Sequence, residues 1–190
     1  MIIIVIILLF IIFRYLLLNK YTYNKLKSSA YIIYDSVCDY KLIDSKNEIE
    51  KNLWLGDYRS ATDNKFIEDN NIKCVINLSK DLNFTDLEID KYRVPIHDNR
   101  SRESDLGMIE HFDSVYDKMK YYIDNDQGVL VHCRAGMQRS ATVVALYMMK
   151  KYKINFDNAK KIIRKKRCIA FYPVINFIGP LKYFETKFNV

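Results

Sequence analysis

The sequence predicts a single α/β domain with a central, mostly parallel sheet flanked by helices, preceded by an N-terminal hydrophobic helix. Apolar stretches of strand length occur at 72–78, 92–96 and 128–132, and helix-like segments separate them. That alternation favours parallel strands joined by helical crossovers. Hydrophobic residues make up 49% of the 190 residues and glycine and proline are few, which is typical of a globular chain. We expect one domain over residues 45–190, a length that is ample for one core.

Residues 1–18 form the most apolar part of the chain, interrupted only by Arg14. About 18 apolar residues are just enough to cross a hydrocarbon core of about 30 Å. No basic residues precede the run, as they would in a secretory signal, whereas Lys20, Lys25 and Lys27 follow it. Because positive charge stays on the cytosolic side, we expect residues 2–18 to form a single-pass membrane anchor, with the domain in the cytosol. A cleaved signal, a surface-docking helix and a soluble cytosolic protein remain alternatives.

Residues 19–44 are expected to link this segment to the domain. Their first part is polar, and an apolar stretch at 31–34 follows. That stretch fits either an added strand or a helical piece lying on the domain, and the sequence leaves both possibilities open.

Residues 132–140, His-Cys-Arg-Ala-Gly-Met-Gln-Arg-Ser, lie between the strand-like run 128–131 and a helix-like segment at 141–150. A loop between a strand and a helix N-terminus points backbone N–H groups inward and can cradle a phosphate dianion. The same positive field favours a thiolate over a thiol, so Cys133 is expected to be a nucleophile. The segment 141–150 is apolar nearly all round, as expected of a buried helix.

The other positions of this loop have separate expected roles. His132 can hold the backbone and the thiolate by hydrogen bonding, and Gly136 permits a positive φ. Arg139 offers a planar fork of donors that matches two phosphoryl oxygens. Ser140 can donate to the sulfur and lies where an N-cap belongs. An unrelated structural cysteine is the alternative, but these residue types coincide at fixed offsets. The expected phosphate-binding set is Cys133, Arg134, Ala135, Gly136, Met137, Gln138 and Arg139.

The loop resembles the signature loop of cysteine-based protein phosphatases, and its form is similar to that of the small dual-specificity branch. The stretch 52–56, followed by Ala61, resembles the opening strand and turn of that branch, and 72–78 its next central strand. Phe177, Leu181 and 184–185 resemble its C-terminal helix. Val174 stands where many members carry asparagine. The resemblance implies a phosphatase-like fold and a catalytic domain over residues 45–190.

Phosphate ester hydrolysis also needs an acid that protonates the leaving oxygen, which is worth about 10²–10⁴-fold in rate. The strand-like stretch 92–96 leads into His97 and Asp98, and polar residues 99–105 follow. This resembles the acid loop of the family, with Asp98 at the position of the acid. Asp105 is the alternative, although its charge also suits the N-terminus of a helix expected over 106–123. His97 is a third candidate, but a partly buried histidine at a strand end explains it without a catalytic role.

The resemblance implies a two-step mechanism. The Cys133 thiolate attacks phosphorus, and Arg139 and the loop amides stabilise the equatorial oxygens. Asp98 protonates the leaving oxygen and then activates the water that hydrolyses the cysteinyl phosphate, and Ser140 helps the thiolate leave. We expect no cofactor and no metal, because the three histidines are scattered and no Cys-x-x-Cys pair occurs.

The expected substrate is a phosphoprotein, dephosphorylated on tyrosine and on serine or threonine. The family resemblance implies a shallow site, and the chain is short for an insertion that grips phosphotyrosine. A phosphoinositide phosphatase is the main alternative, since Arg134 adds a basic residue to the loop while Met137 and Gln138 do not. An RNA 5′-triphosphatase uses the same chemistry. A catalytically inactive phosphoprotein-binding module would typically lack Cys133, Arg139 or Asp98.

The net charge of +7 comes largely from the basic stretch 160–167, whose apolar side is Ala159, Ile162 and Ile163. Such a run is most often a solvated helix face, and attraction to anionic lipid or to an acidic substrate is the functional alternative. No nucleic-acid-binding motif accompanies the charge, so no nucleic-acid partner is expected. The sequence does not predict an oligomeric state.

Overall fold

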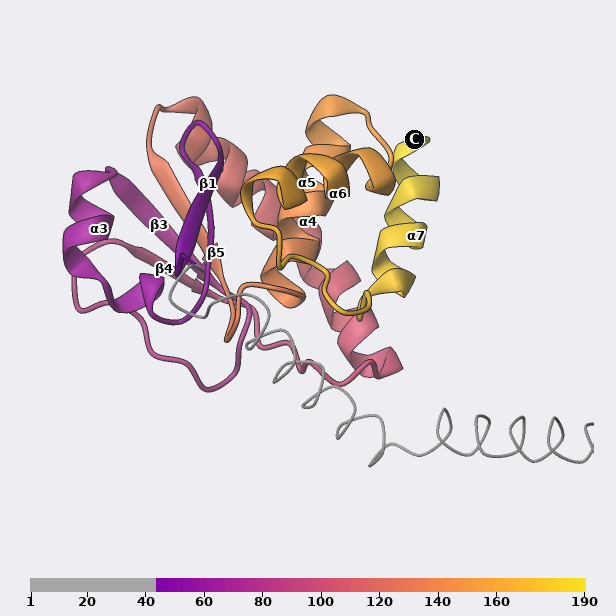
Figure 1. The fold of residues 1–190 in the computed structure, drawn as a ribbon, viewed down its shortest axis with the longest axis horizontal. Helices are drawn as coiled ribbons and strands as arrows, with labels where there is room; N and C mark the ends of the chain where they lie inside the picture. Colours follow the sequence, from indigo (N-terminus) through magenta and orange to yellow (C-terminus); the bar gives the residue numbers. More distant parts are fainter. Residues whose placement is uncertain (1–43) are drawn as a thin grey trace, which may run out of the picture. The chain divides into compact units, whose positions relative to one another are not determined.

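The computed structural model describes residues 44–190. The predicted anchor at 1–18, and all but the last residue of the predicted linker at 19–44, lie outside these residues. Residues 45–190 form one compact unit (Figure 1). Within the described part of the chain, none of the helices combines the length and hydropathy that a membrane crossing requires.

A five-stranded mixed sheet forms the middle of this unit, with the strand order β1-β2-β5-β3-β4. β1 pairs with β2 in antiparallel fashion, and the pairs β2–β5, β5–β3 and β3–β4 are parallel. The predicted α/β fold with a mostly parallel sheet is therefore confirmed. The strands are β1 Lys46–Glu50, β2 Leu53–Gly56, β3 Ile72–Asn77, β4 Asp90–Arg93 and β5 Gly128–His132.

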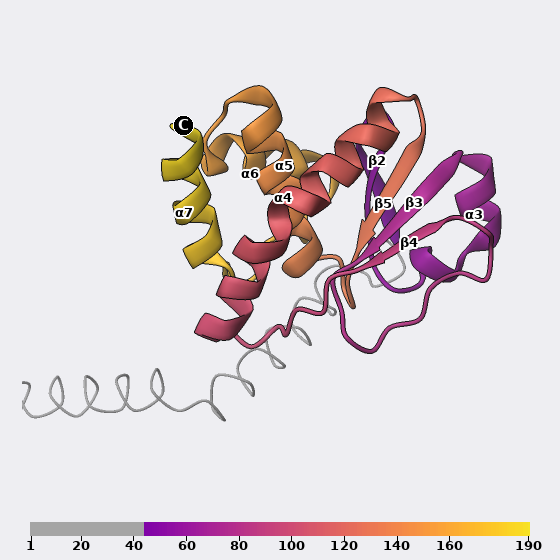
Figure 2. The ribbon, with the colours of Figure 1, turned by 180° about the vertical axis from the view of Figure 1, so that it is seen from behind.

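Helices cover both faces of the sheet (Figures 1 and 2). α3 lies on one face, and α4, α5, α6 and α7 gather on the other. The helices are the 3₁₀ turn η2 Ser60–Thr62, α3 Asn64–Asp69, α4 Arg102–Asp124, α5 Arg139–Tyr152, α6 Phe156–Lys166 and α7 Ile178–Phe188.

The central strand β5 is buried along its whole length, because both faces of the sheet are covered there. Val129 and Val131 pack into the large hydrophobic cluster that includes α4, α5, α6 and α7. Leu130, between them, points to the opposite face and packs with Phe66 and Ile67 of α3. This alternation follows from the two-residue repeat of a strand. The carboxyl end of β5 therefore lies in the middle of the sheet, and that end leads directly into the loop of Cys133.

Several predicted element boundaries are wrong by a few residues. The strand expected at 92–96 is observed as β4 at Asp90–Arg93, because Pro95 has no N–H to donate to a sheet. The helix expected at 106–123 begins at Arg102, since the Ser101 side chain accepts a hydrogen bond from the N–H of Ser104 and caps it there. The helix expected at 141–150 begins at Arg139.

The basic stretch of α6 is exposed as expected, with one difference on its apolar side. Lys161, Arg164 and Lys165 face solvent. Ile163 is buried in the core, but Ile162, predicted to share the apolar side, is 41% exposed. The helical repeat of 3.6 residues places Ile162 about 100° from Ile163, which turns it away from the sheet.

Candidate active site

The signature loop, residues 132–140, joins the end of β5 to the first turn of α5. Gly136 has a φ of +64°, a conformation that side-chain-bearing residues rarely adopt. A Cβ atom on Gly136 would also lie only 2.5 Å from the backbone oxygen of Gly56 and 2.7 Å from Nη2 of Arg167. The tight curvature of the loop at this point therefore requires glycine.

The thiol of Cys133 is buried directly beyond the end of β5, with 1% of the residue exposed. Burial raises the pKa of this thiol, but the Arg139 guanidinium and hydrogen bonds from the Ser140 hydroxyl and N–H lower it by more. The net result is a Cys133 pKa below its ordinary value. The Ser140 hydroxyl oxygen lies 3.2 Å from Sγ. The structure thus places Arg139 and Ser140 beside the Cys133 sulfur, and both groups favour its thiolate form.

The Arg139 side chain is almost buried and is oriented by backbone carbonyls of two neighbouring chain segments. Its Nη1 donates to the oxygen of Ile96 at 3.1 Å and lies 3.5 Å from the oxygen of Leu78. Its Nε makes no hydrogen bond within residues 44–190. The guanidinium is therefore held in place by residues that follow β3 and β4, and it keeps a donor available for an anion at the loop.

Asp98 lies beside this guanidinium. Its Oδ2 is 3.7 Å from Nε of Arg139, and its Oδ1 accepts a hydrogen bond from Nδ2 of Asn176 at 2.5 Å. One quarter of the Asp98 side chain is exposed. The structure thus places this carboxyl group next to the signature loop, where a proton donor for a leaving group would have to be.

Asp105, the alternative acid, lies elsewhere. It belongs to the first turn of α4, and its Oδ2 lies so close to Gly179, at the start of α7, that a Cβ atom on that glycine would clash with it. Burial raises the pKa of Asp105. Its carboxylate packs against a helix terminus, where a negative charge stabilises the helix dipole. This contact with α7 favours a structural role for Asp105 and leaves Asp98 as the candidate acid.

The His132 ring lies in the core, next to the nucleophile in the sequence. The residue is fully buried, and neither ring nitrogen has a hydrogen-bond partner in the described part of the chain. Its ring instead lies edge-on to Phe84, with 6.5 Å between centroids. Burial lowers the pKa of His132 to about 4, so the ring is neutral at neutral pH. The expected hydrogen bond from the ring to the thiolate is absent among residues 44–190, whereas the expected interaction with the local backbone is present, since the Cys133 backbone partly offsets the lowering of the His132 pKa by burial.

Arg167 binds the backbone of the signature loop, a role that the sequence did not reveal. Nε donates to the oxygen of Gly136 at 2.8 Å and Nη2 to that of Ala135 at 3.0 Å. Nη1 donates to Oδ1 of Asn47 at 2.7 Å. Only 2% of Arg167 is exposed. A guanidinium that binds the carbonyls on the outer side of the loop favours N–H groups facing inward. In the sequence, Arg167 is the last residue of a stretch of exposed basic residues. Only the apolar residues that follow it distinguish Arg167 from the others.

Three further loop side chains, those of Gln138, Met137 and Arg134, differ in their burial and partners. Gln138 Nε2 donates to the oxygens of Tyr172 and Val174 at 2.9 and 2.8 Å, so this residue can serve an anion only through its backbone. Met137 is buried. Arg134 is exposed and forms an ion pair with Asp81, with 2.8 Å between Nη2 and Oδ2. Arg134 is therefore the one basic side chain that the loop presents at its rim.

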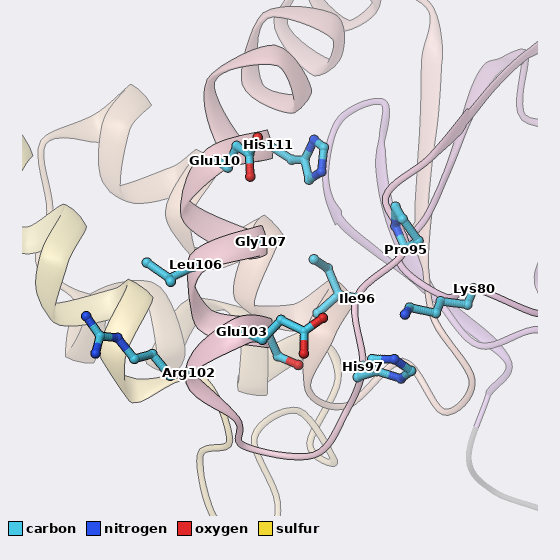
Figure 3. A pocket seen from close by; sticks show the side chains of 11 residues that line it. Lys80, Pro95, Ile96, His97, Arg102, Glu103, Leu106, Gly107, Glu110 and His111 are labelled. Atoms are coloured by element: carbon cyan, nitrogen blue, oxygen red, sulfur yellow. The ribbon is translucent and has the colours of Figure 1, made fainter.

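A pocket of about 460 Å³ lies beside the segment that carries Asp98 (Figure 3). One wall is the exposed side of α4, including Glu103, Gly107 and His111, and the other includes Ile96 and His97. His97 was expected to be partly buried, but it is exposed, because alternate residues of this extended segment face opposite ways. Cys133 does not line this pocket. Among residues 44–190, no group of three or more histidine, cysteine, aspartate or glutamate side chains could hold a metal ion.

Comparison with known proteins identifies the family. The family model for the dual specificity phosphatase catalytic domain matches residues 53–187. AMV078 of Amsacta moorei entomopoxvirus is 38% identical over 140 residues, covering 72% of this chain and 82% of that protein. Dual specificity protein phosphatase 1B of Arabidopsis thaliana is 35% identical over 141 residues, covering 74% of this chain and 82% of that protein.

Solved structures support the same fold. The crystal structure of human DUSP28 superimposes with a TM-score of 0.70 at 20% identity, covering 77% of this chain and 97% of that chain. The segment 53–187, which the family model matches, contains the strand, the loop and the helix around Cys133. The chain therefore belongs to the dual-specificity phosphatase family of cysteine-based phosphatases.

Proposed function

We propose that this phosphatase hydrolyses phosphate monoesters of tyrosine, and of serine and threonine, in protein substrates. The observation that carries the proposal is the environment of the buried Cys133 sulfur. This sulfur accepts a hydrogen bond from the Ser140 hydroxyl, and the Arg139 guanidinium lowers the pKa of the thiol. A buried thiol is ionised only where a positive environment offsets the cost of burial. Such a thiolate, beside the guanidinium of Arg139 and the N–H of Ser140, is suited to nucleophilic attack on a phosphate ester.

In the first proposed step, the Sγ–P bond forms as the P–O bond of the substrate breaks. Arg139 and the loop N–H groups stabilise the charge on the equatorial oxygens. Asp98 gives its proton to the leaving oxygen. In the second step, Asp98 accepts a proton from water as that water attacks phosphorus, the S–P bond breaks and inorganic phosphate leaves. The Ser140 hydroxyl stabilises the departing thiolate.

The loop side chains favour a protein substrate over a phosphoinositide. A ligand with several phosphates needs several cations around the reacting one. Here Met137 and Gln138 are buried, and Gln138 is engaged by the backbone at residues 172–176. Arg134 alone points outward, and it is already paired with Asp81. The retention of Cys133, Arg139 and Asp98 argues against an inactive binding module.

A substrate panel tests the proposal. Phosphate release is measured from phosphotyrosine, phosphoserine and phosphothreonine peptides and from phosphoinositide vesicles. We expect turnover of the peptides, no turnover by Cys133→Ser, and unchanged turnover by the matched control Cys168→Ser, whose thiol is exposed. Faster turnover of phosphoinositides than of every peptide would overturn the assignment of protein substrates. Normal turnover by Cys133→Ser would overturn the mechanism.

We also propose that residues 1–18 tether the domain to a membrane with the catalytic residues on the cytosolic side. The proposal depends on the apolar run and on the lysines that follow it. Membrane flotation of the full chain, compared with a chain lacking residues 1–18, tests it. Equal recovery of both in the unbound fraction would contradict the tether, and protection of the C-terminus from added protease would reverse the orientation.

A further inference from the structure

The loop of residues 172–176 contacts both catalytic loops at once. Asn176, which is 5% exposed, donates from Nδ2 to Oδ1 of Asp98 at 2.5 Å. Its Oδ1 accepts a hydrogen bond from Nε of Arg100 at 3.0 Å. One buried amide group therefore binds two residues of the segment that carries the candidate acid. Nδ2 is a donor and Oδ1 an acceptor, so an asparagine satisfies both contacts simultaneously.

The segment around Asp98 has fixed points on either side. Before it, the oxygen of Ile96 accepts from Nη1 of Arg139. After it, Ser101 caps α4. Arg100, between these points, has a φ of +56°. A residue other than glycine persists in this left-handed region only where its surroundings hold it there, and Asn176 provides such a contact.

Gln138 fixes the position of Asn176 relative to the signature loop. Its Oε1 accepts from the backbone N–H of Asn176 at 3.0 Å, and its Nε2 donates to the oxygens of Tyr172 and Val174. Gln138 is 2% exposed and precedes Arg139 in the sequence. The contacts therefore run from the loop of the nucleophile, through Gln138 and Asn176, to the carboxyl group of Asp98.

We propose that Asn176 is a positioning residue for proton transfer: it holds the Asp98 carboxyl group where it can protonate the leaving oxygen. The proposal rests on the proposed function, in which Asp98 is the general acid. Asn176 touches neither substrate nor sulfur in this role, and acts through Asp98. Its loss should therefore mimic a partial loss of the acid and leave the attack by Cys133 intact.

Two substrates that differ in their leaving groups separate these effects. 4-Nitrophenolate leaves without protonation, whereas the phenolate of phenyl phosphate needs the acid. Since kcat/KM reports events up to formation of the cysteinyl phosphate, we expect Asn176→Ala to lower kcat/KM for phenyl phosphate by about 10-fold and for 4-nitrophenyl phosphate by less than about 2-fold. Asp98→Ala should show the same selectivity with a loss of about 10²-fold or more on phenyl phosphate.

The control variant is Val174→Ala. Val174 lies in the same loop, the residue is 43% exposed, and only its carbonyl joins the network. This variant should leave both substrates unchanged. Asn176→Asp is the second variant, because it preserves the size of the side chain and the acceptor for Arg100 while removing the donor to Asp98. It should show the same selectivity as Asn176→Ala.

The double variant Asp98→Ala/Asn176→Ala completes the test, since residues that act through one group are not additive. We expect no further loss on phenyl phosphate beyond that of Asp98→Ala. Equal losses on both substrates in both Asn176 variants, or additive losses in the double variant, would overturn the positioning role. Equal losses on both substrates in Asp98→Ala would instead remove Asp98 as the acid, so the two failures are distinguishable.

Discussion

Cys74 and Cys133 are both buried, one within the mixed sheet and the other directly beyond it, yet their chemistry is opposite. Cys74 lies within β3, and burial raises its pKa to about 12. Cys133 lies just beyond the end of β5, and Arg139 and Ser140 bring its pKa below the ordinary value in spite of burial. Burial by itself suppresses a thiolate. The difference shows that burial alone does not produce a nucleophilic thiolate. The thiolate also needs the position at the strand end, the N-terminus of the following helix and one guanidinium.

Arg139 is the guanidinium that distinguishes the surroundings of Cys133 from those of Cys74. Its replacement should have the largest effect on catalysis. Arg139→Lys keeps a positive charge but cannot reproduce the geometry of two parallel donors. We expect kcat/KM for 4-nitrophenyl phosphate to fall by about 10²–10³-fold, the usual cost of losing an oriented donor to transition-state charge. Arg164→Lys, on the exposed face of α6, is the matched control. A less than about 3-fold loss in Arg139→Lys would show that charge alone suffices.

Selective alkylation measures the difference between the two thiols directly. At neutral pH, iodoacetamide should modify Cys133 at least about 30-fold faster than Cys74, because thiolate abundance outweighs the lower intrinsic nucleophilicity of a more acidic thiol. Peptide mass spectrometry over time gives both rates in one sample. Orthovanadate, an analogue of phosphate, should protect Cys133 and leave the rate at exposed Cys168 unchanged. Comparable rates at Cys74 and Cys133 would contradict the environment assigned to the sulfur.

His132 extends the comparison to a basic group on β5. Its folded-state pKa of about 4 lies below the ordinary histidine value of 6.5. As the pH falls below about 6.5 the unfolded chain takes up a proton that the folded ring does not accept, so stability present above that pH is lost. We expect a loss on the order of 2 kcal/mol between about pH 6.5 and pH 5.

Urea unfolding of the wild type and of His132→Asn over this pH range isolates the contribution of the ring. The variant should lose the corresponding part of the slope. An unchanged slope in His132→Asn would show that the ring is not held neutral by burial.

Cys74→Ala should have the smallest effect on catalysis. The thiol of Cys74 packs in the hydrophobic core, so its removal should lower the free energy of unfolding by about 1–2 kcal/mol. The kcat/KM of the folded enzyme should remain within about 2-fold of wild type, because Cys74 lies within β3 and outside the signature loop. Denaturant unfolding and steady-state kinetics on one preparation provide both values. A large loss of kcat/KM with normal stability would give Cys74 a role in the site.

The residues around the nucleophile could be predicted because their relationship is local. Cys133, Arg139 and Ser140 lie within one strand-loop-helix unit, so their offsets in the sequence determine their geometry. Asn176 and Arg167 could not be recognised in this way. Each reaches the site through tertiary packing, and neither stands at a spacing that identifies it. Val174, singled out in the sequence by its departure from the family pattern, contributes only its carbonyl.

The fold followed from the alternation of apolar strands and helices, but element boundaries and the role of His132 did not. The first turn of α4 is polar, and the cap at Ser101 rather than hydrophobic periodicity determines where that helix begins. The ring of His132 packs edge-on to Phe84 because the chain between β3 and β4 brings that side chain against it. Such contacts depend on how distant segments fold together, which residue types alone do not specify.

The position of β5 has a consequence for biosynthesis. β2 and β3 do not pair with each other; both pair with β5, which follows them in the chain by more than 50 residues. During translation the sheet stays divided until β5 has emerged from the ribosome. The loop of Cys133 and the first turn of α5 are made immediately after that strand, so the newly synthesised protein completes its sheet and acquires its reactive sulfur in close succession. Incomplete chains that end before β5 lack both the assembled scaffold and the nucleophile.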